Sequence, residues 1–228
     1  MHKILLIMAL CSFSGCHSNT KPSHQSEQPT NNTSEKISYT SLKEKIQLEK
    51  EMIKKSKPTS SKIADKYIVP NLLQLFPYWM GTEWNFYGTT ETPKQGTIAC
   101  GYFVTTLLRD AGLKIPRVKL AQQASSQIIA AVCDKQDIHS FSLTQTNNDS
   151  FFDFIRKQGK ALYIIGLDFH TGFIYYDGDA LRFIQAKYYG EKCVVDEDAT
   201  QSAVILQSKF KQIGKISGSE KSEKLFLK

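Results

Sequence analysis

The sequence has no closely spaced cysteine pair, no internal repeat and no apolar run long enough to cross a bilayer. Its five cysteines stand at positions 11, 16, 100, 133 and 193, and no two of them form a Cys-x-x-Cys pair. A structural zinc site and a dense disulfide framework are therefore not expected. Cys133 and Cys193 can pair in an oxidising compartment, but we favour the interpretation that they are separate, buried and apolar.

Signatures of nucleic-acid binding are also absent, although the chain is basic. The formal net charge is +7, yet there is no Arg-rich helix, zinc-finger spacing or aromatic RNA-binding motif. The charge is better explained as a soluble surface or as attraction to anionic lipid or an acidic wall polymer. The 228 residues are 41% hydrophobic, which is enough for one packed domain with length to spare.

The amino terminus has the layout of an export signal. Lys3 precedes a short apolar run at residues 4–10, and Ser14 and Gly15 precede Cys16. The ending Phe13-Ser14-Gly15-Cys16 resembles a bacterial lipobox, which implies removal of residues 1–15 and lipidation of Cys16. An ordinary signal peptide cleaved nearby is the alternative. We therefore expect an exported protein, anchored by lipid at the cell envelope, in the periplasm or at the outer membrane.

The rest of the chain divides by composition and period. Residues 16–38 are polar and predict a disordered tether, and residues 216–228 predict a polar tail. Between them, residues 39–215 predict one domain with an N-terminal helical extension. Helices are expected over residues 39–55, 63–80, about 97–111, 121–131 and 151–158, and strands over 162–167, 172–176, 181–186 and 203–207. This order predicts an α+β domain in which N-terminal helices pack on a mostly antiparallel sheet.

Cys100 is the first candidate for chemistry. It falls at the start of the helix predicted to end near Ala111 and Gly112, where free N–H groups and the helix dipole lower a thiol pKa. Gly101 follows it and leaves room for a substrate to approach the sulfur. A buried structural cysteine at a helix start is an equally weighted alternative.

His170 is the second candidate, because a neutral imidazole can accept the thiol proton. Of the five histidines, only His139 and His170 fall inside the predicted domain, and His139 lies in an irregular segment. Asp177-Gly178 predicts a hairpin that would bring Gln185 beside His170, where its carbonyl can orient the ring. An outward-facing Gln185, or Asp168 as the orienting group, are the alternatives.

These residues resemble the NlpC/P60 group of papain-like cysteine peptidases and the related CHAP amidases. The resemblance rests on the loop after Gly88, on Ala99-Cys100-Gly101-Tyr102-Phe103-Val104, on His170-Thr171-Gly172-Phe173-Ile174-Tyr175 and on Phe183-Ile184-Gln185-Ala186. The sequence departs from the family pattern at Ala99 and Tyr102, where Asp and Gly are usual.

The resemblance implies a papain-like fold and hydrolysis of an amide bond, typically within peptidoglycan stem peptides or at their junction with the sugar. Cys100, His170 and Gln185 would be catalytic, and Trp84, Tyr87, Gly101 and Tyr102 would contact the substrate. No metal and no cofactor would be required. The open alternatives are a non-catalytic peptidoglycan-binding or scaffold lipoprotein, an antibacterial effector and an acyltransferase. The oligomeric state is left open.

Overall fold

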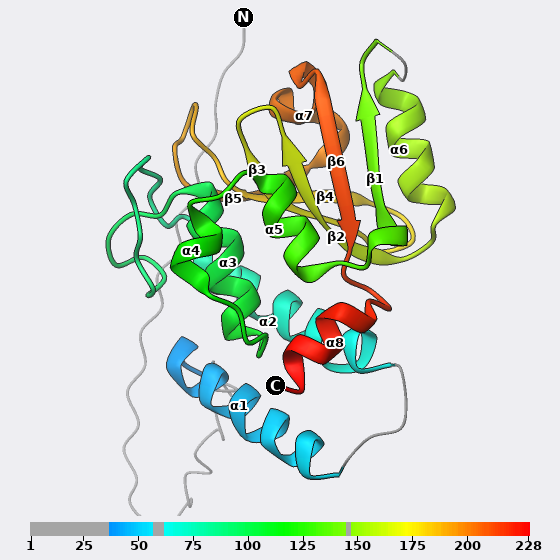
Figure 1. The fold of residues 1–228 in the computed structure, drawn as a ribbon. Coiled ribbons are helices and arrows are strands. Elements are labelled where there is room, and N and C mark those ends of the chain that lie inside the picture. The colour runs from blue at the N-terminus through cyan, green and yellow to red at the C-terminus, as the bar shows by residue number, and fades with distance from the viewer. Residues whose placement is uncertain (1–36, 57–61, 145–146) are drawn as a thin grey trace, which may run out of the picture. The chain divides into compact units, whose positions relative to one another are not determined.

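A computed structural model describes residues 37–56, 62–144 and 147–228. The predicted signal peptide, the predicted lipidation site at Cys16 and nearly all of the predicted tether lie outside these residues. The described chain is α+β, as predicted, with helices around one antiparallel sheet (Figure 1). The sheet order is β1-β6-β2-β3-β4-β5, with bounds β1 Ile138–Ser142, β2 Ala161–Leu167, β3 Thr171–Tyr176, β4 Leu181–Ala186, β5 Val194–Asp198 and β6 Phe210–Lys215.

The helices differ in length and follow the chain in eight α-helical segments within the described residues. They are α1 Tyr39–Lys55, α2 Val69–Trp79, α3 Cys100–Asp110, α4 Arg117–Ala121, α5 Ser125–Val132, α6 Asn148–Lys157, α7 Ala203–Gln207 and α8 Glu220–Phe226. A π-helical turn, Ala64–Ile68, leads into α2, and short 3-10 turns occupy Lys135–Asp137 and Ala199–Gln201. No helix of the described residues is both long and apolar enough to span a membrane.

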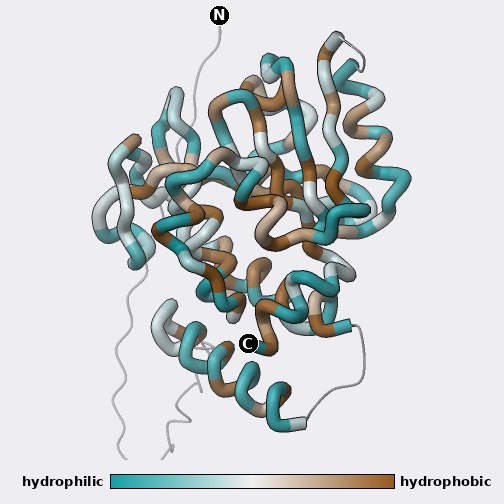
Figure 2. The backbone as a smooth tube through the Cα atoms, in the orientation of Figure 1, coloured by the Kyte–Doolittle hydropathy of each residue, from teal (hydrophilic) through white to brown (hydrophobic). Residues whose placement is uncertain are grey.

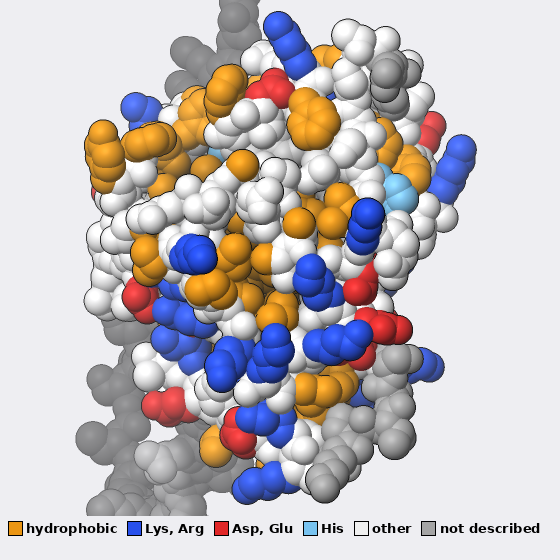
Figure 3. Space-filling model, viewed as in Figure 1, with side chains coloured by type: hydrophobic (Ala, Val, Ile, Leu, Met, Phe, Trp, Pro, Cys, Tyr) orange, Lys and Arg blue, Asp and Glu red, His pale blue; other side chains and the backbone are white. Residues whose placement is uncertain are grey.

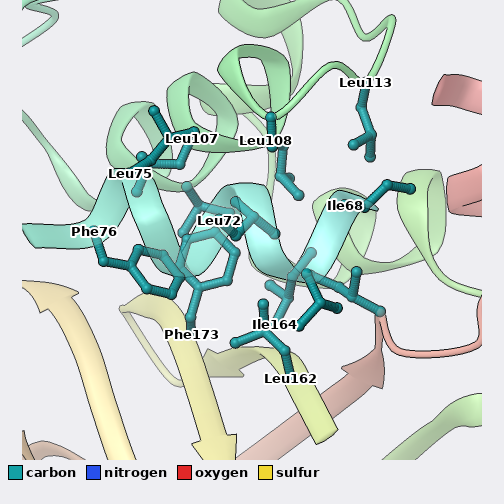
Figure 4. Packing of buried hydrophobic residues seen from close by; sticks show 14 of the residues in the cluster. Ile68, Leu72, Leu75, Phe76, Leu107, Leu108, Leu113, Leu162, Ile164 and Phe173 are labelled. Atoms are coloured by element: carbon teal, nitrogen blue, oxygen red, sulfur yellow. The ribbon is translucent and has the colours of Figure 1, made fainter. Parts of the chain in front are cut away.

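The central strands are buried on both faces, which explains their nearly continuous apolar sequence. On β4, Phe183 points into one hydrophobic cluster and Ile184 into the other, as the two-residue period of a strand requires. One cluster packs against α2, α3 and α5, and the other against α6 and α7. Figure 4 shows the first cluster, in which α2 and α3 side chains meet Phe173 and Ile164.

The N-terminal helix α1 joins this core through polar contacts as well as apolar ones. Tyr39 donates its hydroxyl hydrogen to Asp110 at 2.7 Å, and Lys50 donates to the Gly112 carbonyl at 2.7 Å. Burial, reinforced by Asp110, raises the pKa of Tyr39 far above its usual value. Figure 2 shows that hydrophilic and hydrophobic residues alternate along α1. The apolar residues Leu42, Ile46 and Ile53 of this helix belong to the first hydrophobic cluster.

Several sequence predictions are confirmed by the structure. The helix over residues 39–55 has the predicted bounds, and α3 ends before Gly112, whose φ of +105° suits a residue without a side chain. The strand over residues 181–186 and the hairpin at Asp177-Gly178 are also present. Asp177 accepts from the backbone N–H groups of Asp179 and Ala180, which closes that turn.

Other predictions were wrong. Residues 203–207 form the helix α7 and not a strand, because a five-residue apolar run has no distinctive period. The helix predicted over 121–131 is divided between the end of α4 and α5, which begins at Ser125. The tail predicted to be loose contains α8, whose Phe226 is fully buried. Three strands, β1, β5 and β6, were not predicted, since their polar residues obscure the alternation of a strand.

Candidate active site

Cys100 is the first residue of α3, and Ala99 before it is extended, with φ −84° and ψ 158°. Ala99 has no side-chain oxygen to cap the helix, so the N–H groups of the first turn remain free for another acceptor. The backbone N–H groups of Thr171, Gly101 and Cys100 itself interact with the sulfur and favour its thiolate form. The Thr171 contact places the thiol at the start of β3, one residue beyond His170.

The pKa of the Cys100 thiol is nevertheless raised above its usual value, because burial outweighs these backbone donors. This result contradicts the prediction that the helix start would lower it. A thiol with a raised pKa is protonated at neutral pH and needs a base to remove its proton during attack.

His170 supplies a neutral imidazole close by. Its side chain is buried, its ring lies 5.3 Å from the Tyr188 ring and 6.2 Å from the Phe183 ring, and neither ring nitrogen has a hydrogen-bond partner. Burial lowers the pKa of His170 to about 4, against opposing effects of Gln185 and Glu197. The imidazole is therefore neutral at pH 7 and able to accept a proton.

Gln185 lies on β4 beside the strand that follows His170. A Cβ added to Gly172 would meet the Gln185 Cβ at 3.3 Å, so the two positions face each other across the β3–β4 pair. The Gln185 Nε2 donates to Glu197 Oε1 at 2.7 Å, and the Gln185 Oε1 is buried without a partner. Gln185 is thus fully buried and not the outward-facing residue of the alternative interpretation.

Asp168, the alternative orienting group, forms hydrogen bonds with another segment of the chain. Its carboxylate accepts from the backbone N–H groups of Lys209 at 2.8 Å and Phe210 at 2.9 Å. These bonds lower the pKa of Asp168 and attach the β2–β3 turn to the start of β6. The Asp168 carboxylate is therefore hydrogen-bonded to the backbone at the start of β6.

Two cavities flank the sulfur. Cys100, Gly101 and His170 line both of them, together with residues of the α4–α5 connection. The smaller cavity, of about 260 Å³, also includes Asp168, Ser125 and Thr171. The larger cavity, of about 660 Å³, has six aromatic lining residues: Trp84, Phe86, Tyr87, Tyr102, Phe169 and Tyr188. We call it the aromatic cavity.

No Lys, Arg, Asp or Glu among the described residues lines the aromatic cavity. Its walls are partly open to solvent, since Phe86 is 71% exposed, Tyr87 84% and Phe169 95%. Figure 3 shows hydrophobic side chains gathered on the upper part of the visible face and many Lys and Arg side chains below them. The basic charge of the chain is therefore not concentrated in this cavity.

A buried arginine holds the loop that carries Trp84 and Tyr87. Arg117 donates to the carbonyl oxygens of Thr89 at 2.8 Å and Thr90 at 3.1 Å, and to the Thr106 hydroxyl of α3 at 2.7 Å. The loop is consequently attached to the same helix that begins with Cys100. This attachment keeps the aromatic wall in place relative to the sulfur.

The structure brings all the predicted contact residues together, since Trp84, Tyr87, Gly101 and Tyr102 all line the aromatic cavity with Cys100 and His170. Sequence reasoning missed Phe86, Phe169 and Tyr188, although aromatic residues next to a candidate loop or histidine are a usable signal. It also missed Glu197, which no sequence signal identifies because its contact depends on strand register.

The other two cysteines in the described part of the chain, Cys133 and Cys193, line neither cavity. Cys133 and Cys193 are free, with Cys133 buried and Cys193 partly exposed, so the pairing alternative is not realised. The described residues contain no cluster of His, Cys, Asp and Glu suited to a metal ion. No family model, curated protein or solved structure matches this chain.

Proposed function

We propose that this domain is a cysteine hydrolase in which Cys100 is the nucleophile and His170 the general base. The observation that carries the proposal is the position of the two side chains. The thiol at the start of α3 and the neutral imidazole before β3 border the same two cavities, with the Thr171 N–H at the sulfur. A substrate lying across both cavities would present its carbonyl to the sulfur.

The protonation states define how the reaction would begin. With the pKa of Cys100 raised and that of His170 lowered to about 4, both groups are neutral at pH 7. The imidazole would take the thiol proton as the sulfur bonds to the carbonyl carbon. First-turn N–H groups of α3, including that of Cys100, would hold the resulting oxyanion.

The second half of the reaction returns that proton. The imidazolium of His170 would protonate the leaving amine as the bond between carbonyl carbon and nitrogen breaks. Water, deprotonated by the same imidazole, would then attack the thioester, release the carboxylic acid and restore the thiol. Gln185 would keep the ring oriented through both steps.

The arrangement supports a papain-like fold of the NlpC/P60 or CHAP type as part of this proposal. A helix beginning with the nucleophile packs on an antiparallel sheet, whose β3 and β4 bring His170 and Gln185 together. The proposed substrate is an amide bond in peptidoglycan. Export and lipid anchoring at Cys16 remain part of the same proposal.

The experiment is incubation of the purified chain with peptidoglycan, followed by chromatography of the released fragments. We expect Cys100→Ala to abolish release and Cys193→Ala to retain it, because Cys193 lines neither cavity. Equal release by the parent chain and Cys100→Ala would exclude the mechanism. Binding of peptidoglycan without any release would favour the non-catalytic alternative.

The aromatic cavity favours a second candidate, transfer or hydrolysis of an apolar acyl group. Six aromatic side chains and no ionised one line it, so a charged peptide would lose hydration there without gaining an ion pair. Esters or thioesters of alkyl chains test this candidate directly. Faster turnover of such acyl substrates than of peptidoglycan would favour acyltransferase chemistry on the same cysteine.

A further inference from the structure

Glu197 makes a contact that constrains Gln185. It lies on β5, opposite Phe183, and its carboxylate reaches diagonally to the Gln185 amide at 2.7 Å. An ionised carboxylate can only accept hydrogen bonds, so Gln185 must turn its NH₂ group toward Glu197. The Gln185 carbonyl oxygen then necessarily points away from Glu197.

The polar atoms without a hydrogen-bond partner lie on Gln185 and on His170. The Gln185 Oε1 and both ring nitrogens of His170 are buried without hydrogen-bond partners. Gln185 faces Gly172 across the β3–β4 pair, and His170, two residues before Gly172, lies on the same face of the sheet. The two side chains are therefore neighbours, and Gln185 raises the pKa of His170 against the effect of burial. The Gln185 carbonyl oxygen, which lacks a donor, therefore lies beside the His170 imidazole, whose single N–H lacks an acceptor.

We propose that Glu197 is a positioning residue that selects the tautomer of His170 through Gln185. With its orientation set by Glu197, the Gln185 carbonyl accepts the N–H of one ring nitrogen. The other ring nitrogen keeps its lone pair for the Cys100 proton. This inference rests on the proposed function for its catalytic consequence, but the tautomer itself is a property of the resting protein.

Lys187 completes the arrangement without contacting Gln185. Its ammonium group lies 3.0 Å from Glu197 Oε2, while Gln185 uses the other carboxylate oxygen. Because the amide between Glu197 and His170 is neutral, the carboxylate can set the orientation of the ring without bonding to it directly.

The test measures the tautomer of His170 by long-range ¹H–¹⁵N correlation NMR in the full chain carrying Cys100→Ala. We expect one tautomer in this background and a mixture when Glu197→Leu is added. Asp196→Leu is the matched control, because Asp196 is a carboxylate on the same strand that pairs with Arg182 instead. Lys187→Met should keep the single tautomer, since the amide contact survives.

Turnover by the chain with Cys100 intact provides the second readout. Glu197→Leu should lower kcat by about tenfold to a hundredfold with little change in KM, and Glu197→Gln should retain more of the rate because an amide oxygen can still accept. A single unchanged tautomer in Glu197→Leu overturns the inference, and so does a mixture in Lys187→Met. A tautomer that depends on Glu197 in a chain without hydrolase activity supports the inference while rejecting the proposed function.

Discussion

Gly101 lies so close to the end of α4 that a Cβ on it would meet the carbonyl oxygen of Ala121 at 2.4 Å. The first turn of α3, which carries Cys100, and the end of α4 therefore touch because position 101 has no side chain. Gly101 was predicted to leave room for a substrate, and it does line both cavities. The structure adds that the missing side chain at position 101 also allows α3 to pack against the end of α4.

Gly101→Ala should consequently displace the turn that carries the thiol. We expect a loss of roughly 1–3 kcal/mol in the free energy of unfolding and a larger relative loss of kcat, because backbone and not a flexible side chain must move. Urea denaturation and turnover measure the two effects. Gly159→Ala is the control, since Gly159 has φ +73°, has open space around its Cβ position and lines neither cavity. It should lower stability by about 1 kcal/mol and leave turnover unchanged.

The raised pKa of Cys100 predicts a specific pH dependence of alkylation. The rate of reaction with iodoacetamide should be low at mildly acidic pH and should rise only above the usual range of a free thiol, because the thiolate reacts. A chain with Cys133→Ser and Cys193→Ser isolates this signal among the described cysteines. A plateau of reactivity extending below pH 6 would instead reveal a thiolate–imidazolium pair and contradict the neutral pair described above.

The lowered pKa of His170 predicts that acid destabilises the fold. The folded pKa is about 4, below the ordinary value of 6.5, so the unfolded chain binds a proton in this interval that the folded chain does not. His170 thus contributes stability that is present above pH 6.5 and is lost as the pH falls toward 4. The loss should amount to roughly 2–3 kcal/mol. Urea denaturation at pH 7, 5.5 and 4.5 measures it.

The comparison that isolates this effect is His170→Asn. Its stability should fall less over the same pH interval, because the titrating ring is gone. His139→Asn provides the matched control, since His139 lies on β1, packs against Phe154 and lines neither cavity. Identical pH dependence in the parent and His170→Asn would contradict the lowered pKa.

The lining of the aromatic cavity predicts which side chains contribute to substrate affinity. Tyr87 is 84% exposed yet lines the cavity, so Tyr87→Ala should leave stability within about 0.5 kcal/mol of the parent. The same change should raise KM by about fivefold, because a wall that contacts the substrate is lost. Phe210→Ala removes a partly exposed aromatic ring outside both cavities and should not alter KM. An equal change of KM in the two variants would show that the aromatic cavity is not part of the substrate-binding site.

Local signals in the sequence predicted a substantial part of the fold. The apolar spacing of residues 103–108 and Gly112 identified α3 and its end, because helix period and capping depend on neighbours along the chain. Asp177-Gly178 identified the β3–β4 hairpin for the same reason. Residues 203–207 were misassigned, because a short apolar run is compatible with either a strand or a helix until its packing is known.

The sequence by itself determined the identity and order of the candidate site residues: a cysteine at a helix start, a histidine before a strand and a glutamine on the return strand. Only the tertiary structure decided the ionisation of the cysteine and the histidine, because burial raises the pKa of Cys100, in opposition to the expected helix effect, and lowers that of His170. The contact between Glu197 and Gln185 likewise depends on the register of β4 and β5. Burial and register arise from residues far apart in the chain, and no local pattern encodes them.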